Sequence, residues 1–172
     1  KMKPVIELQK NYGINRFKCA TLGEVELLCK AKVGHILLAI QPTEKKLDAF
    51  LSIQKKYPKI QFSTLLDNNK SLSLFDRIAS QKKQTLGVWI DLNIGMNRTG
   101  IIPNKNGFKL YRNIKESQLI RFMGLHAYDG HIRSKSKIKR KEDSDNAFLS
   151  VLYLKEKIEN HNKKSIDIIA GG

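Results

Sequence analysis

Short apolar runs alternate with longer amphipathic runs along the whole chain, and this alternation limits the possible folds more than any other feature. The apolar runs have the length of β-strands, and the amphipathic runs place apolar residues at helical spacing. Repeated strand–helix units of this kind predict a parallel sheet with right-handed crossovers. We expect strands at 17–20, 35–40, 60–66, 86–92, 119–125 and 166–170, and helices at 4–11, 21–32, 42–56, 71–83, 104–117 and 142–162.

A closed barrel and an open, doubly wound sheet are the two architectures that such units build. No Gly-x-Gly-x-x-Gly follows any expected strand, which disfavours a dinucleotide-binding open sheet. A barrel of eight units typically needs about 250 residues, whereas this chain has 172 residues and about six units. The sequence therefore predicts an α/β fold that is an incomplete (β/α)8 TIM-type barrel of about six parallel strands. Thr21 and Glu24 are spaced as a capping box at the start of the second helix.

The composition is that of an ordinary domain that can bury a core, with 41% hydrophobic residues. No apolar run reaches the roughly 18 to 20 residues of a membrane helix, and the first residues lack the apolar stretch of a secretory signal. Cys19 and Cys29 have no metal-type spacing, and the four histidines are dispersed, so we expect no metal site within the chain. A reducing, cytoplasmic location fits these features.

The net charge of +16 raises nucleic acid as a partner. Most lysines, however, are spread over the expected helices. The densest basic stretch, 133–141 (RSKSKIKRK), contains no interleaved aromatic residues and lies in no nucleic-acid-binding module. A basic nucleic-acid-binding α/β protein is therefore the alternative of another class, and a solvated basic surface is favoured.

The polar segment 91–100 (DLNIGMNRTG) directly follows a strand, at the edge where parallel α/β sheets bind ligands. Asp91 and Asn93 alternate along this strand and therefore point the same way. Arg98 can hold an anionic oxygen by charge-assisted hydrogen bonds. Alternatively, it pairs with Asp91 or Asp129 and only ties the loops together.

A second polar segment, 126–131 (HAYDGH), follows the next strand. His126 and Tyr128 share one strand face, and a tyrosine with a histidine at a strand end suits proton transfer or phosphate contact. A buried tyrosine and a surface histidine would explain the same residues. Gly171 and Gly172, after the last strand, could present backbone N–H groups to a phosphate, although ordinary turns use the same pair.

Four segments taken together resemble the pyridoxal-phosphate enzymes of the D-threonine aldolase and D-serine dehydratase group, which are relatives of alanine racemase. The resemblance covers essentially the whole chain, in the family's order. It implies a pyridoxal-phosphate-binding (β/α)8 barrel followed by a smaller β domain, in a protein that works as a homodimer. The four segments are 17–21 (FKCAT), 91–100, 124–131 (GLHAYDGH) and 170–172 (AGG).

By this resemblance, residues 1–172 are an internal part of the barrel domain, truncated at both ends, and the C-terminal β domain is absent. The family's Schiff-base lysine lies in a pattern like Pro-His-x-Lys-Thr-His-Lys, of which only the last lysine matches, as Lys1. The covalent anchor would therefore precede residue 1, and we expect the piece alone to have no turnover. A divalent metal is compatible with the full-length protein, but its ligands would lie outside this chain.

The resemblance also implies roles for individual residues. Arg98 would contact the ring oxygen of the cofactor. Tyr128 would lie against the cofactor's phosphate or Schiff base, and His131 would act on the substrate side. Gly171 and Gly172 would begin the phosphate-binding turn.

The implied reaction is cleavage of a β-hydroxy D-amino acid to glycine and an aldehyde, with the pyridine ring as electron sink. D-serine dehydratase and amino-acid racemase activity are alternatives on the same fold, and no residue of this chain decides between them. A pyridoxal-phosphate carrier without catalysis is a further alternative.

Overall fold

The computed structural model describes residues 2–171 and shows a regular alternation of helices and strands. The predicted units are confirmed in type and order. The elements are α1 (Lys3–Asn11), β1 (Arg16–Cys19), α2 (Leu22–Lys30), β2 (His35–Leu38), α3 (Glu44–Lys56), β3 (Gln61–Leu66), α4 (Asn69–Lys82), β4 (Leu86–Leu92), α5 (Lys105–Glu116), β5 (Ile120–Ala127), α6 (Lys137–Asn162) and β6 (Asp167–Ala170).

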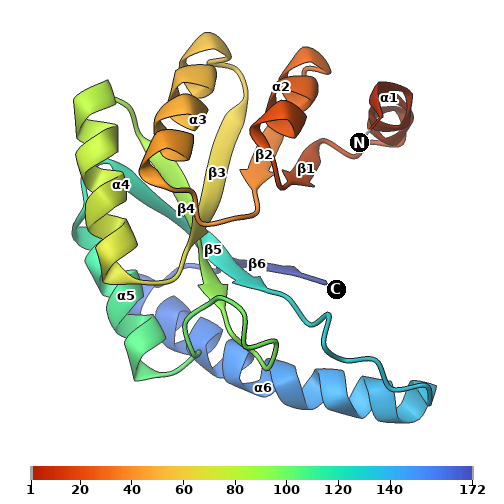
Figure 1. Ribbon diagram of the computed structural model, residues 1–172. Helices are drawn as coiled ribbons and strands as arrows, with labels where there is room; N and C mark the ends of the chain where they lie inside the picture. The colour runs from red at the N-terminus through yellow and green to blue at the C-terminus, as the bar shows by residue number, and fades with distance from the viewer. Residues whose placement is uncertain (1, 172) are drawn as a thin grey trace.

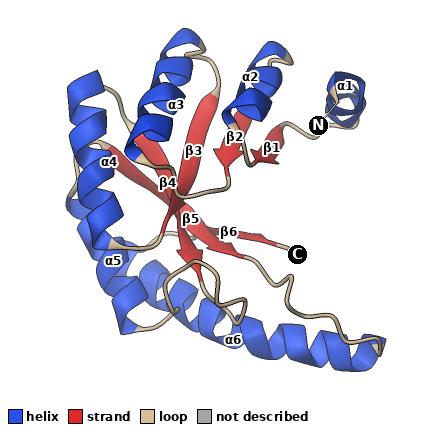
Figure 2. Ribbon diagram, in the orientation of Figure 1, coloured by secondary structure: helices blue, strands red, loops and turns tan. Residues whose placement is uncertain are grey.

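The six strands form one parallel sheet in which their order in space is their order in the chain, from β1 to β6. The sheet is strongly curled, and helices α2 to α6 cover its convex side (Figure 1). Its concave side opens between the two edge strands, β1 and β6 (Figure 2). This is the incomplete TIM-type barrel that the sequence predicts. No helix in residues 2–171 is long and apolar enough to cross a membrane.

Side-chain caps fix where several helices begin. The predicted capping box is present at α2, where Thr21 Oγ1 accepts a hydrogen bond from the backbone N–H of Glu24 (3.2 Å), and the Glu24 carboxylate accepts one from the N–H of Thr21 (3.3 Å). The last helix differs from the prediction, because it begins at Lys137 and not near Glu142. Ser136 caps it, so the end of the basic stretch is helical.

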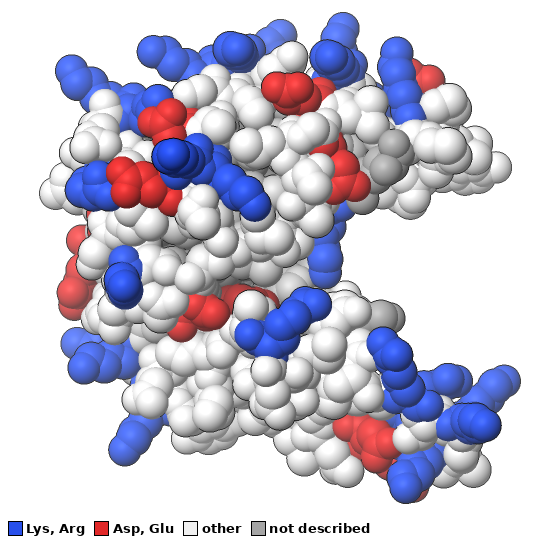
Figure 3. Space-filling model, in the orientation of Figure 1, with Lys and Arg blue, Asp and Glu red and all other residues white. Residues whose placement is uncertain are grey.

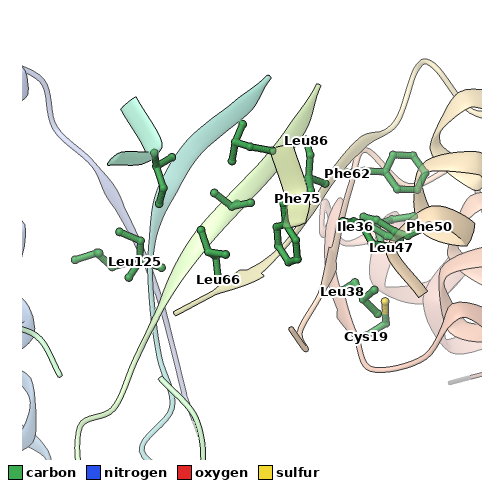
Figure 4. Packing of buried hydrophobic residues seen from close by; sticks show 14 of the residues in the cluster. Cys19, Ile36, Leu38, Leu47, Phe50, Phe62, Leu66, Phe75, Leu86 and Leu125 are labelled. Atoms are coloured by element: carbon green, nitrogen blue, oxygen red, sulfur yellow. The ribbon is translucent and has the colours of Figure 1, made fainter. Parts of the chain in front are cut away.

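The larger apolar core lies between the sheet and the helices (Figure 4). Ile36 and Leu38 of β2 belong to this core: Ile36 lies beside Leu47 and Phe50 of α3, and Leu38 lies beside Cys19 of β1. Successive strand residues face opposite sides of a sheet, so the alternate residues point into the barrel. A smaller inner cluster forms there from Leu37, Leu65 and Trp89.

Three polar side chains form a hydrogen-bonded group in the barrel interior toward its amino end. His35 Nε2 lies 2.7 Å from Ser63 Oγ, and Trp89 Nε1 donates to the same oxygen (3.1 Å). The rings of His35 and Trp89 are stacked, with centroids 6.3 Å apart. His35 is therefore a satisfied core residue at the end of the barrel away from the loops that carry the polar segments.

A bulge interrupts the pairing of β4 with β5. Val88 pairs with Phe122, but the next pair is Trp89 with Gly124, so Met123 is an extra residue in β5. Phe122 and Leu125 both pack into the outer core. A bulge of this kind shifts the phase of the strand that contains it. As a result, His126 of β5 faces into the barrel beside its register partner, Asp91 of β4.

Basic side chains are spread over the face of the molecule that Figure 3 shows, and they are dense at the start of α6. The same view shows the concave side of the sheet as a hollow between two arms of the molecule. One arm carries the first strands and helices, and the other is α6 with the loop before it.

Candidate functional site

A cavity of about 520 Å³ lies at the carboxyl ends of the parallel strands, on the inner side of the sheet. This is the end of an α/β barrel at which active sites form. Its polar wall comes from four separate parts of the chain: β1, β4, the loop after β4, and β5 with the loop that follows. The polar side chains used below are Lys18, Asp91, Arg98, Thr99, His126 and Tyr128.

Asp91 and His126 form the buried centre of this wall. They are partners in the register of β4 and β5, and both point into the barrel. The Asp91 carboxylate lies 2.7 Å from His126 Nδ1 and accepts a second hydrogen bond from the Thr99 hydroxyl (2.9 Å). The two residues are 7% and 4% exposed, so this pair is held in a fixed geometry with little access for water.

Lys18 reaches the same group from the opposite side of the barrel. Its Nζ lies 3.1 Å from His126 Nε2, although β1 and β5 are not neighbours in the sheet. Burial of the amine is the main cause that lowers the pKa of Lys18. The Asp91 charge opposes this effect, and the Arg98 charge adds to it.

Arg98 and Tyr128 meet at the outer part of the cavity. The Arg98 guanidinium carbon lies 5.5 Å from the centre of the Tyr128 ring, and Lys18 Nζ lies 5.7 Å from it. Both contacts have the geometry of cation–π interactions. Within residues 2–171 neither cation forms an ion pair with a carboxylate, so the pairing of Arg98 with Asp91 or Asp129 does not occur. The cavity therefore contains two basic side chains that form no ion pair with a carboxylate of the described residues.

The predicted cavity residues do not all come together. Arg98 and Tyr128 line the cavity, and so do Asp91 and His126. Asn93 instead folds onto its own loop, where its Oδ1 accepts hydrogen bonds from the N–H groups of Gly95 and Asn97 (3.1 Å each).

His131 lies beside the main cavity and borders a second, smaller hollow together with Arg133 and Asp143. Its ring packs against Gly95, where a Cβ atom would collide with His131 Nε2. Gly95 has a φ of +127°, which favours glycine. The two loops that carry the polar segments are therefore in contact through this pair.

Gly171 directly follows β6, at the same rim as Tyr128, because Ala127 and Ala170 are register partners. It is exposed, has a φ of +132°, and has no other atom near the position of a Cβ. Backbone at this position is accessible to a ligand. Gly172 and Lys1 lie outside the described residues.

The sequence prediction missed Lys18 as a site residue. It also did not predict the hydrogen bond between Asp91 and His126. One local signal was present for Lys18. It is the charged residue between Phe17 and Cys19, which are both buried, so alternation places it on the inner face near the end of β1. The contact with His126, 108 positions away, has no local signal. Residues 2–171 contain no cluster of three or more His, Cys, Asp and Glu side chains suited to a metal ion.

Comparison with known structures gives the same fold. The crystal structure of D-threonine aldolase from Filomicrobium marinum matches with a TM-score of 0.86 and 19% identity over 98% of this chain and 45% of that one. D-threo-3-hydroxyaspartate dehydratase from Delftia sp. HT23 matches with a TM-score of 0.84 and 15% identity over 99% and 50%. SrLDC in complex with PLP and cadaverine matches with a TM-score of 0.74 and 17% identity over 99% and 41%.

At these identities the likeness shows the fold alone, and the chain spans half or less of the length of these structures. A comparison with curated protein sequences gives no significant match. A family model, described as the N-terminal domain of alanine racemase, matches residues 1–168, which is nearly the whole chain. The chain therefore belongs to the family of the alanine racemase N-terminal domain.

Proposed function

We propose that the chain is part of a pyridoxal-phosphate-dependent lyase that cleaves β-hydroxy D-amino acids in the manner of D-threonine aldolase. The observation that carries the proposal is the convergence of Arg98, Tyr128 and the Asp91–His126 pair on one cavity at the carboxyl rim of an alanine racemase-type barrel. The names of two of the matched structures, an aldolase and a dehydratase of β-hydroxy amino acids, support this choice of reaction.

The residues of the cavity suit pyridoxal phosphate. A cavity of about 520 Å³ lies in the usual range for small-molecule and cofactor sites. Arg98, which has no carboxylate partner among the described residues, suits a ligand that carries a phenolate oxygen, a phosphate and an amino-acid carboxylate. When bound, the cofactor supplies an electron sink for the breaking of bonds at Cα.

Each residue has a defined task in this proposal. Arg98 binds the ring oxygen of the cofactor by charge-assisted hydrogen bonds. Tyr128 lies against the cofactor's phosphate or Schiff-base end, and Gly130 makes room for it, because a Cβ at Gly130 would collide with the Tyr128 hydroxyl. Gly171 and Gly172 offer backbone N–H groups to the phosphate. His131 lies on the substrate side, at the loop contact with Gly95.

The first experiment measures binding and product together in the complete protein that contains this chain. Addition of pyridoxal phosphate should give a protein-bound visible absorbance, and D-threonine should then yield glycine and acetaldehyde. A protein that stays colourless would refute the assignment of the cofactor. Formation of a 2-oxo acid and ammonia would show dehydratase activity in place of aldolase activity. Inversion of configuration at Cα would show racemase activity.

The Arg98→Met variant tests the cofactor contact. Loss of a hydrogen bond to a charged group costs about 1.5–3 kcal/mol, so the Kd for pyridoxal phosphate should rise about 10- to 150-fold. Quenching of tryptophan fluorescence reports binding, because Trp89 lies on β4 two residues before Asp91. Arg112→Met is the matched control, because Arg112 is exposed on α5 and its loss should leave the Kd unchanged. Equal Kd values for both variants would remove Arg98 from the site.

A further inference from the structure

Lys18 is a charged residue of the cavity wall, and neither the sequence prediction nor the proposed function gives it a chemical task. Its side chain leaves β1 on the inner face and ends at the cavity, 3.1 Å from His126 Nε2. The amine remains accessible from the cavity, because Lys18 is exposed whereas its neighbours Phe17 and Cys19 are buried. A ligand in the cavity can therefore reach a nitrogen that is already hydrogen-bonded to a histidine.

The order of the hydrogen bonds fixes how protons are arranged in this group. A carboxylate only accepts hydrogen bonds. Asp91 must therefore accept from His126 Nδ1–H at one oxygen and from the Thr99 hydroxyl at the other. This leaves Nε2 of His126 facing Lys18, with one proton between the two nitrogens.

The surrounding charges favour an amine that can give up this proton. Asp91 of β4 and His126 of β5 face the amine from one side, and Arg98 of the loop and Tyr128 face it from the other. Directly after the neighbouring strand β2, the wall of the cavity is formed by Ala39, Ile40 and Gln41 and carries no charge. A lysine that is partly removed from water and close to another cation is more readily neutral than a lysine in solvent.

Arg16 is the remaining charged group near Lys18 on β1. It points the same way but lies one step nearer to the amino end of the barrel, where it pairs with Asp167 of β6 at 3.6 Å. The causes that shift the pKa of Lys18 do not include the Arg16 charge. The charged groups that act on the lysine amine are the Asp91 carboxylate, which is already engaged by His126 and Thr99, and the Arg98 guanidinium.

We propose that Lys18 is the general acid–base residue of this site and exchanges its proton with the β-hydroxyl group of the substrate. The proposal rests on the proposed lyase function. In the cleavage, neutral Lys18 takes the hydroxyl proton as the aldehyde C=O bond forms. The Cα–Cβ bond breaks, and its electron pair stays with the amino-acid fragment. Cα then takes up one proton to give glycine, so the reaction balances without a further reactant.

A purely structural role is the competing explanation, since the contact also ties β1 to β5 across the barrel. Replacement by arginine separates the two roles. A guanidinium can still donate a hydrogen bond to His126 Nε2, but it does not release a proton near neutral pH. The structural role predicts that Lys18→Arg is active. The acid–base role predicts that Lys18→Arg and Lys18→Ala both lose about a hundredfold or more in kcat, with a smaller change in KM.

The kinetic experiment uses the complete protein loaded with pyridoxal phosphate and D-threonine as substrate. Methylammonium added to Lys18→Ala should restore part of kcat, with a pH dependence that follows the added amine. Lys10→Ala is the matched control, because Lys10 donates to the Ala31 carbonyl (2.6 Å) outside the cavity, and its kcat should equal that of the wild type. Wild-type kcat in Lys18→Arg would overturn the proposal for Lys18 alone. A wild-type protein without lyase activity would overturn the proposed function and this role with it.

A second measurement requires no turnover. The protein is treated with a trace of an acetylating reagent over a range of pH, and mass spectrometry measures the acetylation of each lysine. The result gives the pH at which each amine becomes neutral. Lys18 should react at lower pH than Lys45, which is exposed on α3. The Asp91→Asn variant should move the Lys18 midpoint further down, because the Asp91 charge raises the pKa of Lys18. Equal midpoints for Lys18 and Lys45 in the wild type would contradict the proposal.

Discussion

His35 lies inside the barrel, where its imidazole contacts Ser63 and stacks on Trp89. Burial lowers the pKa of His35, and the nearby Arg16 charge lowers it further. In the unfolded chain His35 has its ordinary pKa, near 6.5. As the pH falls, the unfolded chain therefore binds a proton at His35 before the folded chain does. The contribution of His35 to the free energy of unfolding is complete above pH 6.5 and falls as the pH drops below it.

Urea unfolding at pH 7.5 and 5.5 should show this loss in the wild type and a smaller one in His35→Gln. Removal of the exposed His161 in His161→Gln should leave the difference between the two pH values unchanged, and an equal effect of both variants would contradict the assignment to His35.

Helix α2 shows what a single cap contributes at the scale of an element. Thr21 satisfies the N–H of Glu24, and loss of such a cap costs about 1 kcal/mol, within a range of roughly 0.5–2 kcal/mol. Thr21→Ala should lower the free energy of unfolding by that amount, measured in urea. The chain contains its own control, because Thr43 occupies the same position at α3 but forms no side-chain cap hydrogen bond. Thr43→Ala should be close to neutral. If both variants lost the same stability, the effect would come from the loss of threonine itself and not from the capping box.

At the scale of the whole molecule, Gly124 at the bulge of β5 lies where three strands pair, beside Trp89 of β4 and Asp167 of β6. Its φ of +144° favours glycine, and a Cβ there would lie 2.6 Å from the Trp89 ring and against the Asp167 backbone oxygen. Because β5 pairs with both β4 and β6, Gly124→Ala must push these strands apart, and we expect it to cost about 2 kcal/mol or more. Gly23→Ala in α2 is the control. A Cβ there meets no atom within 4 Å, so it should stabilise the protein by roughly 0.5–1 kcal/mol. Trp89 fluorescence during unfolding measures both variants, and an unchanged midpoint in Gly124→Ala would show that the sheet can relax around the added methyl group.

The fold could be predicted from the sequence because its signals are local. The apolar run at 35–40 contains the strand His35–Leu38, which is buried at every position, and the amphipathic runs between strands have helical spacing. The capping box at Thr21 is a signal of four residues and was correctly predicted. The start of α6 was not, because the basic residues at 137–141 carry no apolar stripe, and the cap at Ser136 fixes that boundary.

The sequence by itself determined that polar residues cluster after β4 and β5 at one rim of a parallel barrel. Only the tertiary structure decided which of them meet. The extra residue in β5 shifts its phase, so His126 faces inward opposite Asp91, and the curl of the sheet brings Lys18 across from β1 to His126. The physical reason is the sequence separation of the interactions. Strand alternation and helical spacing are set by neighbours in the chain, whereas a bulge and a contact across the barrel depend on how distant strands pair and pack.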